Sequence, residues 1–211
     1  MNLLNKLQKN WNVNGILFFP IVYRRLLNKF YNFLFLKKYH IQSDYSSFIY
    51  GIKYMKIGSV TLGRHCRIEI ITEYNNKKLN PCLKIGERVS INDRVHIGCA
   101  NYIEIGDDCL FASNIYISDH NHGMYKGDKQ SSIFEPVIER DLDYDKSIII
   151  GKNVWIGEGV AVLPGAKIGD NSIIGSNAVV IGEIPANSIT VGVPAKIIKQ
   201  YDKNTKSWLR V

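Results

Sequence analysis

Apolar residues recur at every sixth position over much of the second half of the chain. From residue 150 onward the step is kept without a slip, at Ile150, Ile156, Val162, Ile168, Ile174 and Val180. Mostly small residues follow four places after each of them, at Val154, Val160, Ala166, Ser172, Ala178 and Ile184. An amphipathic α-helix would show a period of 3.6 residues and a half-buried strand a period of two. A six-residue period is instead typical of β-helix repeats.

The geometry of such a repeat explains the residue types. Three hexads, each with one short strand, make a triangular coil of about eighteen residues, and successive coils stack by parallel hydrogen bonding. The branched residue fills the narrow interior. Glycine follows four of the six apolar positions, at Gly151, Gly157, Gly169 and Gly175, where the missing Cβ allows a sharp corner.

The same step runs upstream with interruptions. It occurs at Leu62 and Ile68, at Ile85, Ile91 and Ile97, and at Ile105, Phe111 and Ile117. A polar stretch over residues 69–84 and a two-residue insertion after Ile97 separate these runs. We expect an all-β core, a parallel β-helix of roughly five coils over residues 51–200. An antiparallel β-sandwich would not keep a six-residue step for so long.

Composition favours one domain with an extension. The chain has 211 residues, of which 45% are hydrophobic. Its cysteines, Cys66, Cys82, Cys99 and Cys109, form no Cys-x-x-Cys pair, which favours reduced thiols. The apolar run over residues 15–23 contains Pro20 and is shorter than the ~20 residues of a membrane-spanning helix. We therefore expect a cytoplasmic protein.

Positive charge is concentrated at the N-terminus. The formal net charge is +8, and no Asp or Glu precedes Asp44, whereas seven Lys and Arg residues do. The rest of the chain is nearly balanced, which argues against nucleic acid as a partner. Residues 1–50 are therefore predicted to form a basic, aromatic helical extension, and residues 201–211 a C-terminal tail.

The extension has two interpretations that can coexist. Apolar residues at Leu26, Leu27, Phe30, Phe33 and Leu34, with basic residues between them, suit an amphipathic helix. We favour a helical cap on the first coil, because solenoids need their ends covered. The other interpretation is contact of residues 1–43 with the inner face of a membrane that carries anionic lipids.

Several segments resemble the hexapeptide-repeat acyltransferases. The segments are "INDRVHIG", "IEIGDDCLFASNIYIS", "NVWIGEGVAVLPGAKIGDNSIIGSNAVV" and "VGVPAKIIK". Over about residues 57–200 the chain is similar to the branch of sugar O-acetyltransferases that act on galactosides, maltose, nodulation factors and bacterial surface polysaccharides. The resemblance implies a left-handed β-helix, a homotrimer, and acetyl-CoA as co-substrate in the groove between neighbouring subunits.

Residues 118–147 leave the repeat as a long excursion loop that begins with two histidines. Long loops on rigid scaffolds often carry function. His120 matches the family's histidine at the start of such a loop, and a neutral imidazole there can accept the proton of a sugar hydroxyl that attacks the thioester. His122, two residues away, is the alternative base, and a purely structural pair is the third possibility. Asp119 could orient the ring, as could a backbone carbonyl, Glu135 or Asp141.

The resemblance also implies roles for residues outside the loop. Asn92 matches an asparagine that bonds substrate or base, although asparagine is also an ordinary turn residue. Trp155 matches an aromatic residue that lines the acceptor or coenzyme cleft. For the coenzyme, the resemblance implies backbone contacts at Gly157, Gly175 and Ser176 and phosphate contacts at Lys196 and Lys199. One departure is Gly182 in "VIGEIP", where several relatives have lysine.

The sequence thus predicts an acetyl-CoA-dependent sugar O-acetyltransferase of cell-surface glycan assembly that requires no metal. A carbonic-anhydrase-like zinc site is disfavoured, because His120 and His122 are two residues apart rather than five and His65 and His96 lie on hexads. Two rival functions remain: an N-acetyltransferase of an amino sugar or antibiotic, and a β-helix trimer without catalytic activity.

Overall fold

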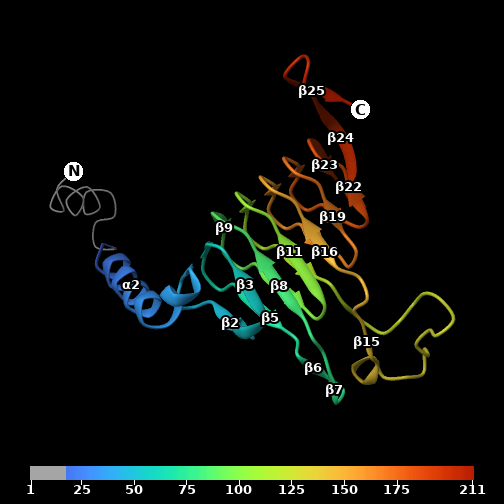
Figure 1. Ribbon diagram of the computed structural model, residues 1–211, viewed down its shortest axis with the longest axis horizontal. Helices are drawn as coiled ribbons and strands as arrows, with labels where there is room; N and C mark the ends of the chain where they lie inside the picture. Colours follow the sequence, from blue (N-terminus) through green and yellow to red (C-terminus); the bar gives the residue numbers. More distant parts are fainter. Residues whose placement is uncertain (1–17) are drawn as a thin grey trace.

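The computed structural model describes residues 18–211, whose strands wind into a three-sided column of stacked coils (Figure 1). Each complete coil contributes one strand to each of the three faces, which we name A, B and C, and each face is a sheet of parallel strands. Face A contains β1 (Ile41–Ser43), β4 (Val60–Leu62), β9 (Val89–Ile91), β12 (Leu110–Phe111), β17 (Trp155–Ile156), β20 (Ile173–Ile174) and β23 (Ser188–Val191). Face B contains β2 (Phe48–Tyr50), β5 (Arg67–Ile70), β10 (His96–Cys99), β13 (Tyr116–Ser118), β18 (Ala161–Val162) and β21 (Val179–Val180). Face C contains β3 (Met55–Ile57), β8 (Cys82–Ile85), β11 (Tyr102–Ile105), β16 (Ile148–Ile150), β19 (Lys167–Ile168) and β22 (Glu183–Ile184).

The six-residue step marks the interior of the column, as predicted. On face B, Ile68, Ile97, Ile117 and Val162 are in register on successive coils and have no exposed surface. The corners use asparagine as well as glycine. Asn153, Asn171 and Asn187 adopt positive φ, and their side chains form a chain of hydrogen bonds of 2.9 and 3.1 Å along the column. Buried thiols complete the core, and burial raises the pKa of Cys109 to about 11.

The column has more coils than the sequence predicted. Residues 41–184 form six complete coils and β23 begins a seventh, whereas the hexads indicated roughly five. The extra coil is the first one, β1 to β3, and residue 50, predicted as a domain boundary, falls inside it. The register places Ser43 of β1 at the position of Leu62 in β4, six residues before Ile49, so the step of this coil begins with a polar residue and a search for apolar steps passes over it.

A helical segment precedes the first coil. Helix α2 (Phe18–Tyr31) continues into the π-helical turn η2 (Asn32–Leu36) and the 3₁₀ turn η3 (Lys37–Tyr39). Leu36 is buried in the core cluster, and Tyr31 and Tyr39 pack against it. The helical segment therefore lies against the first coil, and Figure 1 shows it at the opposite end of the column from the C-terminal strands. Residues 1–17 of the predicted extension lie outside the described residues.

Three segments depart from the column. A hairpin of β6 (Glu73–Tyr74) and β7 (Lys77–Lys78) leaves the second coil, and the first coil contains the short turn η4 (Ile52–Tyr54). In the excursion loop, β14 (Asn121–His122) pairs antiparallel with β15 (Leu142–Asp143), and the turn η5 (Val137–Glu139) lies between them in the chain. At the C-terminus, β24 (Lys196–Asp202) and β25 (Ser207–Arg210) extend face A: β24 pairs antiparallel with β23, and β25 pairs antiparallel with β24. Most of the predicted tail is thus part of a strand pair. Within residues 18–211 no helix has the length and apolar character needed to cross a bilayer.

Candidate active site

His120 lies where the chain leaves the fourth coil, two residues after the end of β13. Its side chain is 12% exposed. The Nδ1 atom is 3.1 Å from Asp119 Oδ1 and 3.3 Å from Ser118 Oγ. The Ser118 hydroxyl donates to the His120 carbonyl oxygen at 3.0 Å, so its oxygen can accept from Nδ1. A proton on Nδ1 satisfies both neighbours and leaves Nε2 as the basic nitrogen.

Asp119 is held rigidly by the backbone of the coil before it. The residue is fully buried, and its two carboxylate oxygens accept hydrogen bonds from the N–H groups of Ala100 and Asn101, at 2.8 and 2.9 Å. Backbone donors fix a carboxylate more firmly than flexible side chains do. The predicted orienting partner of His120 is therefore in contact with the ring and is itself held by two backbone hydrogen bonds.

Gly98 of β10 provides the surface against which the His120 ring lies. A Cβ atom at this glycine would be 3.1 Å from His120 Cε1 and 3.8 Å from Nε2 of His96. The imidazole rings of His120 and His96 therefore both lie next to Gly98, which has no side chain. Any other residue at position 98 would push against the His120 ring.

His96 is a second histidine at this position, which the sequence placed on a hexad without a role at the site. Burial lowers the pKa of His96, and the nearby positive charge of Arg67 lowers it further, so the ring is neutral near pH 7. Its Nε2 atom is buried without a hydrogen-bond partner among the described residues, 3.8 Å from Glu69 Oε2. No spacing rule indicated it, because only the register of β10 with β13 places it beside the site.

His122 contacts different residues from those that contact His120. Its ring is exposed and its Nδ1 atom is 3.0 Å from the hydroxyl of Tyr74, which itself donates to the Ile138 carbonyl at 3.1 Å. Since the tyrosine proton is used there, His122 Nδ1 acts as the donor to Tyr74. The contact joins the β6–β7 hairpin to the excursion loop. The sequence did not indicate a role for Tyr74, because this residue lies in the polar stretch of residues 69–84.

Further contacts fix the shape of the excursion loop. The Asn75 amide donates to the Glu139 carbonyl, and Lys77 pairs with Asp141. Inside the loop, the buried Arg140 donates to the carbonyl oxygens of Ser132 and Glu135 and to the hydroxyl of Tyr125. Asp141, considered above as a partner for His120, is thus engaged with Lys77. The loop is a structured element rather than a passive connection.

A cavity of about 800 Å³ lies between the excursion loop and the column. Asn121, Tyr125 and Lys126 line the loop side. Leu163, Pro164 and Lys167 line the column side, and the cavity also has carboxylates, Asp143 and Asp145, of the kind that bond sugar hydroxyls. His120 is not among the lining residues, although the next residue, Asn121, is.

Asn92 and Trp155 lie away from His120 in the single chain. Asn92 is exposed at the corner between faces A and B, and its N–H donates to the Phe111 carbonyl at 3.0 Å. Trp155 is 51% exposed on the outside of face A, in register with Leu110 and Ile173. His120 lies at the other end of face B. One chain therefore does not bring these three predicted residues together.

The predicted coenzyme residues lie on the last coils. The N–H groups of Gly157 and Gly175 donate to the carbonyls of Ile174 and Thr190, both at 2.8 Å, so they hold coils together and are not free for a ligand. A Cβ at Gly157 would be 2.7 Å from the Ser176 nitrogen, which explains the glycine structurally. Ser176 is exposed, as is Lys196 of β24, whereas Lys199 is half-buried.

Among residues 18–211 no three His, Cys, Asp or Glu side chains are placed to hold a metal ion.

Comparisons with known proteins identify similar chains. The family model described as bacterial transferase hexapeptide (six repeats) matches residues 147–182. WbbJ of Escherichia coli K12, whose name assigns it to lipopolysaccharide biosynthesis as an O-acetyltransferase, is 47% identical over 123 residues. That match covers 58% of this chain and 62% of WbbJ, so the chain spans less than two thirds of its relative's length.

Solved structures show the same fold. A maltose O-acetyltransferase from Clostridium difficile 630 is 29% identical with a TM-score of 0.55, over 72% of each chain. A galactoside acetyltransferase in complex with coenzyme A is 27% identical with a TM-score of 0.51, over 72% of this chain and 66% of that one. AntD, an N-acyltransferase from Bacillus cereus, has a TM-score of 0.61 at 20% identity, over 81% of this chain and 89% of that one, and shows the fold only. The predicted resemblance is confirmed: the chain has the left-handed β-helix fold of the hexapeptide-repeat acyltransferases and is similar to their sugar O-acetyltransferase branch.

Proposed function

We propose that this chain is an acetyl-CoA-dependent O-acetyltransferase that acetylates a hydroxyl of a sugar during assembly of a bacterial cell-surface polysaccharide. The observation that carries the proposal is the contact between His120 and the buried, backbone-held Asp119. Such a pair has the arrangement of a general base and its orienting carboxylate. The similarity to WbbJ and to the sugar acetyltransferases supports the choice of donor and acceptor.

In this proposal His120 accepts the proton of the acceptor hydroxyl through Nε2. The hydroxyl oxygen then forms a bond to the acetyl carbonyl carbon, and the carbon–sulfur bond breaks. The charge that develops on the ring is stabilised by Asp119, and the ring returns its proton to the departing thiolate. Acetyl-CoA supplies the activated thioester. A base in this position is typically worth ~10²–10⁴ in rate.

The coenzyme fits part of the predicted set of residues. Ser176 and Lys196 are exposed and could contact it, as could the half-buried Lys199. The N–H groups of Gly157 and Gly175 are used within the column. The proposed backbone contacts at these two turns therefore fall to their other backbone groups.

The proposal includes a homotrimer. Trp155 lies on the outside of face A and Asn92 at its corner with face B, whereas His120 lies at the far end of face B. A second copy that packs its face A against the excursion loop of the first would bring these residues to one cleft. The proposal also includes contact of residues 1–43 with the inner face of a membrane. Residues 1–17 of that segment lie outside the described residues.

Mass spectrometry of products tests the function. The protein would be incubated with acetyl-CoA and a panel of nucleotide sugars and oligosaccharides, with matched hydroxyl and amine acceptors. We expect one added acetyl group that mild alkali removes, because esters hydrolyse and amides do not. An alkali-stable product would identify an N-acetyltransferase instead. Failure to bind acetyl-CoA in a calorimetric titration would favour a protein without catalytic activity.

A further inference from the structure

Helix α2 and the turn after it present an apolar face to solvent. Phe19, Tyr23, Leu26, Phe30 and Phe33, which we name the apolar stripe, are each at least 60% exposed. Their spacing of four and three residues places them on one side of the helix. A surface helix of a globular protein normally buries such a side against the core. Here it points outward.

The opposite, polar side of the helix docks onto the first coil. The Arg24 guanidinium donates to both carboxylate oxygens of Asp44, at 2.9 and 2.6 Å, and the Asn28 amide donates to the same carboxylate at 2.8 Å. Asn32 exchanges two hydrogen bonds of 2.7 Å with the backbone of Ser43. These charge-assisted contacts fix which way the helix faces. The outward orientation of the apolar stripe is therefore built into the fold.

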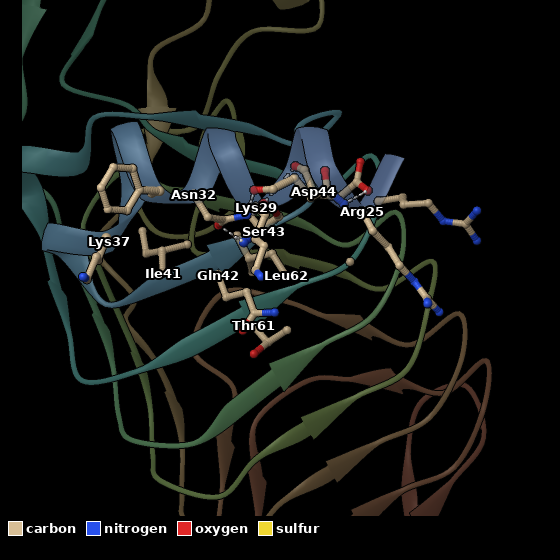
Figure 2. A pocket seen from close by; sticks show the side chains of 14 residues that line it. Arg25, Lys29, Asn32, Lys37, Ile41, Gln42, Ser43, Asp44, Thr61 and Leu62 are labelled. Atoms are coloured by element: carbon tan, nitrogen blue, oxygen red, sulfur yellow. Dashed lines mark hydrogen bonds between the residues drawn. The ribbon is translucent and has the colours of Figure 1, made fainter. Parts of the chain in front are cut away.

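A basic groove runs beside the apolar stripe. It is a cavity of about 630 Å³ between α2 and the strands β1 and β4, and Figure 2 shows Arg25 and Lys37 toward its two ends. Lys29 lies between them, Ile41 and Leu62 are among its apolar lining residues, and Phe33 belongs to both the groove and the stripe. Within residues 18–43 there is no acidic side chain, and Asp44 is already engaged by Arg24. The groove therefore favours anions.

We infer that the apolar stripe and the basic groove form a docking surface for a bilayer that contains anionic phospholipids. The stripe enters the boundary between headgroups and acyl chains, and a lipid phosphate binds between Arg25 and Lys29. The charge of the surface argues for this occupant: a second copy related by a two-fold axis would place like charges together. The inference rests on the membrane contact proposed above and is independent of acetyl transfer.

Vesicle sedimentation with the full-length protein tests the inference. We expect binding to vesicles of phosphatidylcholine with phosphatidylglycerol and weak binding to phosphatidylcholine vesicles. The double variant Leu26→Ser/Phe30→Ser should lose binding. Because each basic residue near an anionic surface contributes about fivefold in partitioning, Arg25→Gln/Lys29→Gln should bind about 25-fold more weakly. Lys203→Gln/Lys206→Gln, with the same charge change on the exposed C-terminal hairpin, should bind as the wild type does.

Other outcomes would overturn the inference. They are no binding to anionic vesicles, equal binding to both vesicle types, or equal loss of binding in the C-terminal control. A change of mass in ultracentrifugation for Leu26→Ser/Phe30→Ser would show that a second copy covers the stripe. All of these variants keep Arg24, Asn28 and Asn32, and circular dichroism would check the fold. Acetyl transfer to a soluble acceptor, measured in parallel, separates a failure of this inference from a failure of the proposed function.

Discussion

At the scale of single residues, the site depends on the absence of a side chain as much as on the presence of an imidazole. His120 and Asp119 could be predicted from the sequence, because they lie at the start of a loop that interrupts a regular repeat. Gly98 could not, although it faces the ring of His120 directly. Its φ is not positive, so its role is to leave space rather than to allow an unusual backbone conformation.

Gly98→Ala should therefore reduce activity with little effect on stability. The added Cβ would lie 3.1 Å from His120 Cε1, so the ring must shift by a few tenths of an ångström. Since misplacement by about 1 Å can cost about 100-fold in rate, we expect turnover to fall by about tenfold. Steady-state kinetics and a thermal melt would check both parts. Normal turnover in this variant would show that the ring tolerates displacement.

At the scale of elements, helix α2 is held to the column by the polar contacts of Arg24 and Asn28 with Asp44, besides the packing of Tyr31 against the core. Burial alone would raise the pKa of Asp44, but hydrogen bonds from Arg24, Ser46 and Asn28 outweigh it and hold the pKa far below the ordinary value of 3.8. The sequence predicted the helix from its amphipathic pattern and favoured its role as a cap. That pattern could not show that the polar side would face the protein.

Asp44→Asn should loosen this docking. Charge-assisted hydrogen bonds are worth about 1.5–3 kcal/mol, and Arg24 is partly exposed, so we expect α2 to lose about 2 kcal/mol of local stability. Hydrogen exchange of the α2 amides at neutral pH measures it. Because folding lowers the pKa of Asp44, its contribution is complete above the unfolded value of about 4 and is lost as the pH falls through the folded value. The difference between the two proteins in thermal midpoint should therefore shrink below pH 4, and a difference that grows there would contradict this account.

The excursion loop shows the same limit of sequence reasoning. Its boundaries, residues 118–147, are visible in the repeat, and β13 and β16 end and begin there. Its contact with the β6–β7 hairpin through Tyr74 and His122 is not visible, because the two segments are 48 residues apart and neither has a periodic pattern. His122 therefore resembled a rival base in the sequence. In the structure its ring is a link between two loops.

At the scale of the whole molecule, the predicted site residues are distributed over separate parts of the column. The hexads determined which residues are inside and therefore the column itself. They carry no information about which outer faces meet another copy, because those faces differ only in exposed side chains such as Trp155. The sequence could predict the fold, whereas the role proposed for His120 and the proposed assembly both rest on resemblance as well.

A trimer should be detectable directly. Analytical ultracentrifugation should give a mass of about 72 kDa, three times the 24.0 kDa of one chain. Trp155→Ala should weaken coenzyme or acceptor binding and raise KM, because the ring would line a cleft formed between copies. A monomer with full activity would contradict the proposed contribution of a second copy.

The central claim, that His120 is the base, is tested most directly by the turnover numbers of His120→Ala and His122→Ala, measured with saturating acetyl-CoA. We expect His120→Ala to lose about 10²–10⁴ in turnover while its acetyl-CoA affinity and mass stay unchanged. His122→Ala should stay within a few-fold of the wild type, because its ring contacts Tyr74 rather than His120. Near-normal turnover in His120→Ala would contradict the account.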